Sequence, residues 1–303
     1  MDKSSPATGI NWCCPVCGLI LHRDDKVWLC ANAHSFDIAR QGYVNLLLAQ
    51  QKKSRQPGDD QQAVEARRKF LQQGHYQPLI ENISDLLQAW LPAASDDGKY
   101  RLLDCGCGEG WYIQALQETL PADKLENVEF AGLDISRPAI LNAAKSVKNA
   151  TFAIASAFSI PLPAQSLDCV LQVFAPASDE EIHRILKTDG LLIRVTPAQN
   201  HLLQLREQLY PDLHQRDIEQ PDKNCFEKIR EQRSTFGIVL QSSEAINSLL
   251  RMTPHFWKAN TSRREELLAK ESLQVSADML VSVYRKLESV PVNPWQRRAT
   301  QHA

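Results

Sequence analysis

A short apolar run that ends in a glycine-rich turn is the feature that most limits how this chain can fold. Residues 102–110 read LLDCGCGEG, an expected strand followed directly by a G-x-G-x-G loop. Glycines in such a loop let the backbone adopt positive φ angles and approach a ligand closely. We therefore predict a strand, a ligand-binding turn and a helix here. A glycine turn that joins a strand to a helix without binding anything is the alternative.

The spacing of the glycines indicates the kind of ligand. A dinucleotide-binding loop, G-x-G-x-x-G, would place its third glycine at position 111, where a small residue lets helix and strand pack closely. Trp111 stands there, so we expect a nucleoside cofactor without a pyrophosphate, S-adenosylmethionine. The residues predicted to bind it in this region are Asp104, Gly106, Gly108, Glu109, Gly110 and Tyr112.

A second expected strand, residues 128–134, ends in the carboxylate of Asp134. Open α/β folds place at this point the acid that accepts the ribose hydroxyls of a bound nucleoside. Ser136 can cap the helix that follows, and Pro138 suits its first turn. The sequence therefore predicts that Asp134 binds the ribose.

Further strands are expected over residues 151–155, 167–174 and 191–195, with helical segments between them. Strands that alternate with helices form a parallel sheet covered on both faces. The predicted fold class is therefore α/β. That this α/β domain is a class I (Rossmann-like) methyltransferase domain is implied by the family resemblance described below.

Helices are also expected before the cofactor loop, over residues 62–73 and 76–91. A long antiparallel pair of strands, 226–240 and 273–284, is expected around a helix at 252–257, and a methyltransferase sheet ends with such a reversed pair. In the segment 76–91, apolar side chains recur at helical spacing and are predicted to lie on the sheet. These side chains are Leu79, Ile80, Ile83, Leu86, Leu87 and Trp90.

Four potential metal ligands lie close together near the N-terminus. Cys14 and Cys17 form a C-x2-C pair, and after twelve intervening residues Cys30 and His34 form C-x3-H. Structural zinc takes four thiolate or imidazole ligands in tetrahedral geometry, commonly from two short knuckles. Cys13 is left out because it would break the C-x2-C spacing. We predict zinc bound by these four residues; chance clustering of thiols in a reduced protein is the alternative.

A basic segment follows this zinc-binding module. The net charge of −2 does not indicate nucleic-acid binding, so any contact with RNA must rely on a local surface. A solvated linker is the alternative, but attachment to a zinc module favours RNA. Trp12, Trp28 and Tyr43 could stack bases, but aromatic residues in so small a module more often fill its core, so no stacking role is assigned to them. The cations predicted to contact RNA are Arg40, Lys52, Lys53, Arg55, Arg67 and Arg68.

Several further motifs occur together along the chain. They are HSFDIARQGYVNLL (34–47), PGD (57–59), ARR (66–68), GHYQPL (74–79), FAP (174–176), TP (196–197) with HL (201–202), and MTP (252–254) with Trp257. With the zinc ligands and the glycine loop, this set resembles the RlmA (RrmA) type family of 23S rRNA guanine-N1 methyltransferases. The likeness extends over nearly the whole chain, from about residue 14 to 285.

The resemblance implies a division of the chain. The expected parts are a zinc-binding RNA-recognition module (1–49), a basic linker with helices (50–99), an S-adenosylmethionine-dependent methyltransferase domain (100–290) and a polar tail (291–303). The family works as a homodimer, which the resemblance therefore implies for this protein.

The resemblance also implies a substrate and further site residues. The expected reaction is methylation of N1 of a guanine in a domain II hairpin loop of 23S rRNA, at guanine 745, with the neighbouring guanine 748 as the alternative. Tyr76 and His201 are implied as cofactor contacts, although alone they would suggest a core aromatic and a surface histidine. Ser156 and Ala157 follow the third strand, where class I methyltransferases hold the adenine.

Methyl transfer from a sulfonium needs the nucleophile, methyl group and sulfur aligned in a dry pocket. Guanine N1 carries a proton, so a base or a pocket that favours its deprotonated form is needed. The fourth strand ends QVFAP and lacks the Asn/Asp-Pro-Pro-aromatic motif of enzymes that methylate exocyclic amines, which favours a ring nitrogen. Phe174 is a candidate for packing against the extruded base. No catalytic base can be named.

Composition limits the other possibilities. No apolar run approaches the roughly 20 residues that span a bilayer, and the polar start lacks a signal-peptide core. Eight cysteines without a secretion signal indicate a reducing compartment, so we expect a cytoplasmic protein that does not bind a membrane. Two other functions stay open: a small-molecule methyltransferase with a purely structural zinc module, and an RNA-binding protein with an inactive methyltransferase domain.

Overall fold

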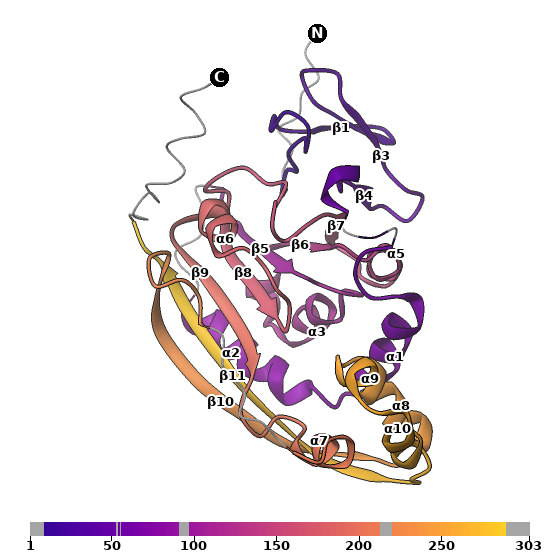
Figure 1. Cartoon of the computed structure of the whole chain (residues 1–303). Coiled ribbons are helices and arrows are strands. Elements are labelled where there is room, and N and C mark those ends of the chain that lie inside the picture. Colours follow the sequence, from indigo (N-terminus) through magenta and orange to yellow (C-terminus); the bar gives the residue numbers. More distant parts are fainter. Residues whose placement is uncertain (1–8, 53, 55, 91–96, 213–219, 289–303) are drawn as a thin grey trace.

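A computed structural model describes residues 9–52, 54, 56–90, 97–212 and 220–288 (Figure 1). The expected polar tail and two of the expected RNA contacts, Lys53 and Arg55, lie outside these residues. The strands are β1 (His22–Asp24), β2 (Val27–Leu29), β3 (Ser35–Asp37), β4 (Val44–Asn45), β5 (Tyr100–Cys105), β6 (Val128–Asp134), β7 (Ala150–Ile154), β8 (Leu167–Val173), β9 (Leu186–Pro197), β10 (Phe226–Leu240) and β11 (Leu273–Lys286). The helices are η1 (Ala49–Gln51), α1 (Gln61–Leu71), α2 (Gln77–Trp90), α3 (Trp111–Thr119), α4 (Ala122–Leu125), α5 (Arg137–Ser146), α6 (Asp179–Ile185), α7 (Leu203–Leu209), α8 (Ser243–Arg251), α9 (His255–Lys258) and α10 (Thr261–Leu268).

An eight-stranded sheet forms the centre of the molecule, in the order β10-β11-β9-β8-β5-β6-β7-β4. The strands from β9 to β4 are parallel, whereas β11 is antiparallel to both β9 and β10. The chain leaves β5 towards β6 and β7 and then crosses to β8 on the other side. The carboxyl ends of β5, β6 and β8 therefore meet at a switch point, where open α/β sheets bind ligands. The expected class I methyltransferase architecture, including the reversed final pair, is confirmed.

Apolar side chains on the two faces of the sheet enter two separate cores. In β5, Leu102 belongs to one core and Leu103 to the other, as the alternation of side chains along a strand requires. The first core includes buried residues of α2, α3, α5 and α8. The second core includes Trp12 and Leu21 from the N-terminal module, so this module covers part of one face of the sheet.

The N-terminal module also extends the sheet. Its strands β1, β2 and β3 form a separate antiparallel sheet, but β4 pairs in parallel with β7 at the edge of the main sheet. The backbone N–H of Cys13 donates to the carbonyl of Pro161 at 2.8 Å. Trp12 and Tyr43 are buried and Trp28 is half-buried, which agrees with their expected place in the core. The module and the larger domain therefore share both hydrogen bonds and core.

Most expected elements occur close to the expected bounds, and three expectations were wrong. No helix separates β7 from β8, because residues 155–166 form turns and loops that contain Pro161 and Pro163. Of the helix expected at 252–257, only residues 255–257 are helical, as part of α9, because α8 ends at Arg251. Pro254 lacks a backbone N–H and therefore interrupts the hydrogen bonds of α8. Trp90 was expected on the sheet, but it is the last residue of α2 and is 36% exposed. Helical spacing continues to Trp90, but the neighbouring structure does not cover this end of the helix.

Candidate cofactor and zinc sites

The glycine loop forms a tight turn between β5 and α3. The backbone N–H groups of Gly106 and Cys107 both donate to the carbonyl of Leu133 at 2.9 Å, which joins the turn to the end of β6. Gly106, Gly108 and Gly110 have φ angles of +83°, +54° and +81°, values that L side chains rarely adopt. Helix α3 begins directly after Gly110. The expected strand, turn and helix are therefore present.

The three glycines differ in what surrounds them. A Cβ atom on Gly106 would lie 2.3 Å from the Cβ of Ala175, and one on Gly110 would lie 2.9 Å from its nearest neighbour. A Cβ on Gly108 would meet only Arg67 Nη1, at 3.8 Å. Gly106 and Gly110 are thus required for packing within the protein. Gly108 leaves space beside the loop for a ligand.

Asp104 lies on β5, two residues before Gly106, and is 1% exposed. Neither of its carboxylate oxygens has a hydrogen-bond partner among the described residues. Burial, followed by the nearby charge of Asp134, raises the pKa of Asp104 to about 8. A buried carboxyl without a donor is costly, and a cationic donor would both satisfy and ionise it. The α-ammonium group of S-adenosylmethionine is such a donor, so the site fits the expected cofactor.

Asp134 lies beside Asp104 at the end of the neighbouring strand. Its Oδ2 accepts from Gly108 N at 2.9 Å and its Oδ1 accepts from Ser136 N at 2.8 Å. Ser136 also caps α5 by accepting from Ala139 N, as expected. Burial raises the pKa of Asp134, whereas the two backbone donors lower it. Each oxygen retains a second lone pair, so the carboxylate can still accept from the ribose hydroxyls.

Three rings gather where β8 ends. Phe174 lies 5.5 Å from the ring of His201 and 6.5 Å from the ring of Tyr76, measured between ring centroids. Tyr76 and His201 are buried, and His201 Nδ1 accepts from the backbone N–H of Asp278 at 3.2 Å. Phe174 is 39% exposed and has a φ of +53°, an uncommon and strained value for an aromatic residue. The structure thus places an exposed ring over two buried rings from distant segments.

The remaining expected cofactor residues lie around the same strand ends. Burial raises the pKa of Glu109 to about 7, against the lowering effect of Arg68 and Arg67. Tyr112 lies in the first turn of α3, where burial raises its pKa well above its usual value. The bond from Ala155 N to the carbonyl of Asp134, 3.1 Å, places the following residues next to the end of β6. These residues are the half-buried Ser156 and Ala157.

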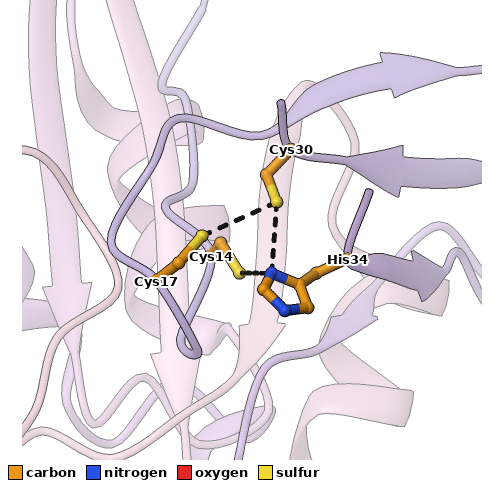
Figure 2. A group of neighbouring side chains, drawn as sticks. All are labelled: Cys14, Cys17, Cys30 and His34. Atoms are coloured by element: carbon orange, nitrogen blue, oxygen red, sulfur yellow. Dashed lines mark hydrogen bonds between the residues drawn. The ribbon is translucent and has the colours of Figure 1, made fainter. Parts of the chain in front are cut away.

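The four expected zinc ligands converge at one point (Figure 2). The Sγ of Cys17 lies 3.7 Å from that of Cys30, and the Nδ1 of His34 lies 3.4 Å from Cys30 Sγ and 3.6 Å from Cys14 Sγ. All four ligand atoms lie within 4.8 Å of one another. Zn–S bonds of about 2.3 Å and Zn–N bonds of about 2.0 Å imply separations of roughly 3.5–3.8 Å in a tetrahedron. The geometry fits a structural zinc ion, and Cys13 lies outside the cluster.

Local hydrogen bonds form the two zinc knuckles. In the first, Gly18 N donates to the carbonyl of Cys14 and Cys14 N donates to that of Leu19, both at 2.8 Å. In the second, Cys30 N donates to the carbonyl of His34 at 3.1 Å. The other cysteines, Cys105, Cys107, Cys169 and Cys225, are free and buried, as expected for reduced thiols.

The expected RNA contacts divide into two groups. Arg40 and Lys52 are exposed at or beside the zinc module. Arg67 instead points towards the cofactor loop, where it pairs with Asp59 at 2.5 Å, and the half-buried Arg68 lowers the pKa of Glu109. The ARR motif therefore does not continue the exposed basic segment. Arg67 lies on α1 beside Gly108, and the RNA contacts expected at Arg67 and Arg68 stay predictions.

Sequence reasoning also missed the residues that hold the turn after β8. Gln172 Nε2 donates to the carbonyl of Ala175 at 2.5 Å, and Arg194 Nε donates to Gln172 Oε1 at 2.7 Å. Arg194 also pairs with Asp179 and is 7% exposed. This network fixes the turn that carries Phe174. Gln172 and Arg194 are the polar residues within the otherwise apolar runs 169–173 and 190–195, which is the signal that could have identified them.

Comparisons with known proteins match both parts of the chain. Residues 12–55 match the family described as RlmA, N-terminal, a zinc ribbon, and residues 96–262 match a methyltransferase domain. A Bacillus subtilis (strain 168) protein assigned to the 23S rRNA guanine-N1 methyltransferases is 32% identical over 282 residues, covering 90% of this chain and 96% of that protein. The 23S rRNA (guanine(748)-N(1))-methyltransferase of Streptomyces fradiae is 36% identical over 197 residues, covering 65% of this chain and 66% of that enzyme. A Micromonospora griseorubida protein of the same assigned class is 30% identical over 295 residues, covering 90% of this chain and 97% of that protein.

Among the described residues, no helix is both long and apolar enough to cross a bilayer.

Proposed function

Since this chain belongs to the RlmA type family of 23S rRNA guanine-N1 methyltransferases, we propose that it methylates N1 of a guanine in a domain II hairpin loop of 23S rRNA. The observation that carries this proposal is the joining of an RlmA zinc ribbon to an S-adenosylmethionine-dependent methyltransferase domain in one chain. A small-molecule methyltransferase would not need the ribbon. An inactive relative would not need the unpartnered acid at the cofactor loop.

The bound cofactor supplies an electrophilic methyl group on its sulfonium. Asp104 would hold the ammonium group and Asp134 the ribose, with Gly106, Gly108, Glu109, Gly110 and Tyr112 around them. Ser156 and Ala157 would lie against the adenine. Tyr76 and His201 would contact the cofactor beside Phe174, and these rings exclude water from the reacting atoms.

The exposed ring of Phe174 would pack against the target guanine after it leaves its stack. The Gln172 and Arg194 network holds this ring in place, which keeps N1 aligned with the methyl group. We assign no general base. The proton on N1 must leave in or before transfer, so the reaction should accelerate with pH until guanine N1 itself ionises.

The zinc module and the exposed cations Arg40 and Lys52, with Lys53, Arg55 and Arg68, are proposed to bind the rRNA. The net charge of −2 leaves this contact to a local basic surface. The expected homodimer, cytoplasmic location and domain limits at 49, 99 and 290 stay predictions.

The target guanine has two candidates. Guanine 745 is the position that the sequence resemblance favours. Guanine 748 is the second candidate, because the Streptomyces fradiae relative is named for it. Neither the loop residues nor the zinc ligands distinguish these two positions.

Methyl transfer from labelled S-adenosylmethionine to protein-free 23S rRNA tests the proposal. The product should be N1-methylguanine, identified by mass spectrometry of the digested RNA. Because this mark blocks reverse transcriptase, primer extension on rRNA from a deletion strain should lose one stop, and its place distinguishes guanine 745 from guanine 748. A stop that persists in the deletion strain, together with unlabelled rRNA, would refute the rRNA substrate.

A further inference from the structure

The segment before the cofactor domain is attached to the cofactor loop at several points. Gly58 packs so closely that a Cβ there would lie 2.9 Å from side-chain atoms of Ile135 and Ser136. Ser136 Oγ donates to the carbonyl of Asp59 at 2.7 Å. Asp60 then caps α1 by accepting from Ala63 N at 2.8 Å. The start of α1 is therefore fixed against the turn that follows β6.

This attachment directs one cation into the cofactor site. Arg67, two turns into α1, has its Nη1 atom 3.8 Å from the position of a Cβ on Gly108. Burial raises the pKa of both Asp134 and Tyr76, and the nearby charge of Arg67 opposes that rise at each group. Its side chain is 26% exposed and pairs with Asp59 at 2.5 Å, and its Nη2 donates to the carbonyl of Met252 at 3.5 Å.

The charged side chains around the cofactor loop are complementary to the charges of an α-amino acid. A free α-amino acid end carries an ammonium group and a carboxylate on the same carbon. Asp104 offers two buried acceptor oxygens without donors among the described residues, and Arg67 brings a guanidinium to 3.8 Å from the position of a Cβ on Gly108. Guanidinium groups bind carboxylates through two parallel hydrogen bonds.

We propose that Arg67 binds the carboxylate of the methionine moiety of S-adenosylmethionine, and that Asp59 holds the guanidinium towards the loop. Arg67 thus recognises the cofactor and does not contact RNA. A guanidinium has five N–H donors, so it can bind the ligand carboxylate without releasing Asp59. The half-exposed ion pair with Asp59 is weak enough to adjust when the ligand enters.

The test compares S-adenosylmethionine with decarboxylated S-adenosylmethionine, which lacks only the carboxylate, by isothermal titration calorimetry on the full chain. The wild-type protein should prefer S-adenosylmethionine by about tenfold or more, as expected for charge-assisted hydrogen bonds. Arg67→Gln should lower the affinity for S-adenosylmethionine by that factor and leave the affinity for the decarboxylated ligand nearly unchanged. Arg67→Lys, which keeps the charge but not the two-pronged geometry, should keep part of the preference.

Lys69→Gln is the matched control, because Lys69 lies on the same helix but pairs with Glu244 of α8 at 2.8 Å. It should leave both affinities at the wild-type level. The inference fails if the wild-type protein does not distinguish the ligands. It also fails if Arg67→Gln keeps the preference for S-adenosylmethionine. Equal loss of affinity for both ligands would likewise contradict it, since that result indicates a purely structural role.

This inference depends on the cofactor and not on the rRNA substrate, so the two proposals can fail separately. If Arg67→Gln loses the preference for S-adenosylmethionine but the wild-type protein does not methylate 23S rRNA, the inference holds and the proposed substrate is rejected. If Arg67→Gln does not fold, as judged by circular dichroism, a reduced preference in Arg67→Lys decides the question.

Discussion

The zinc cluster and the cofactor pocket are built in opposite ways. All four zinc ligands come from residues 14–34, and backbone hydrogen bonds within each knuckle place them. The expected cofactor residues come from α3, from Tyr76 just before α2 and from the ends of several strands that are far apart in the sequence. The zinc ligands already lie at ligand distance, whereas Asp104 is buried without a partner. The geometry of the local zinc site therefore follows from the spacing of its ligands in the sequence, whereas the geometry of the cofactor site follows from the packing of distant segments.

The largest expected effect is loss of the zinc site. Cys17→Ser removes one of four ligands, and structural zinc contributes on the order of 10 kcal/mol to the folding of small zinc modules. The purified wild-type protein should contain about one zinc per chain, and the variant much less. Hydrogen exchange should increase over residues 12–46, where the module joins the sheet through β4, and RNA binding should weaken.

Cofactor affinity in Cys17→Ser should stay close to the wild-type value if the two sites are independent. Full zinc occupancy in the variant would exclude the proposed ligand set. A parallel loss of cofactor binding would show that the shared core couples the two regions, and the contrast between them would then be wrong.

The second prediction compares two glycines of the cofactor loop. Gly106→Ala places a Cβ 2.3 Å from Ala175 and should destabilise the protein by about 3 kcal/mol or more, because it adds a clash to an unfavourable positive φ. Gly108→Ala adds only the conformational cost, about 1 kcal/mol. Urea denaturation measures both.

Cofactor binding should depend on Gly108, whereas stability depends more strongly on Gly106. Gly108→Val should fold but not bind S-adenosylmethionine, because its side chain occupies the open space beside the loop. Wild-type affinity in Gly108→Val would place the cofactor elsewhere.

The third prediction concerns Asp104. Its pKa is about 8 in the folded protein and near 3.8 in an unfolded chain, so the folded state binds more protons between these values. The stability of the ligand-free protein should therefore fall as the pH rises through this window. Asp104→Asn should remove this fall and be more stable than the wild type at pH 9.

The same variant should lose roughly 1.5–3 kcal/mol of S-adenosylmethionine binding, the range for a hydrogen bond to a charged group. Thermal melts from pH 4 to 9 and calorimetry measure the two effects. A melting profile with the same pH dependence as the wild type would mean that Asp104 is ionised in the free protein.

The smallest expected effect concerns RNA. Replacing Lys52 and Lys53 with Glu should weaken rRNA binding and make its dependence on salt less steep, by roughly 0.7 in the log–log slope for each lost contact with a single-stranded phosphate. Lys69→Glu is the control, since that lysine faces α8. An unchanged salt dependence would remove this segment from the RNA-binding surface, and cofactor affinity should not change in either variant.

Local patterns predicted well those features that depend on neighbours in the chain. The strands 128–134 and 226–240 have the predicted bounds, and Ser136 caps its helix. The helix at 252–257 was wrong because Pro254 divides it, and Trp90 was wrong because periodicity does not reveal where covering structure ends. The position of Arg67 beside Gly108 could not be predicted, because the charge of a residue in a sequence does not show where its side chain points.

The sequence by itself determined the zinc ligands, the strand–glycine loop–helix turn and the order of strands and helices. Each depends on spacing, glycine conformation or alternation within a short segment. Only the tertiary structure decided that the zinc module would cover a face of the sheet and extend its edge through β4. It also decided that Asp104 would lack a partner and that α1 would direct Arg67 towards Gly108. These features depend on burial and contacts between distant segments, which no local spacing specifies.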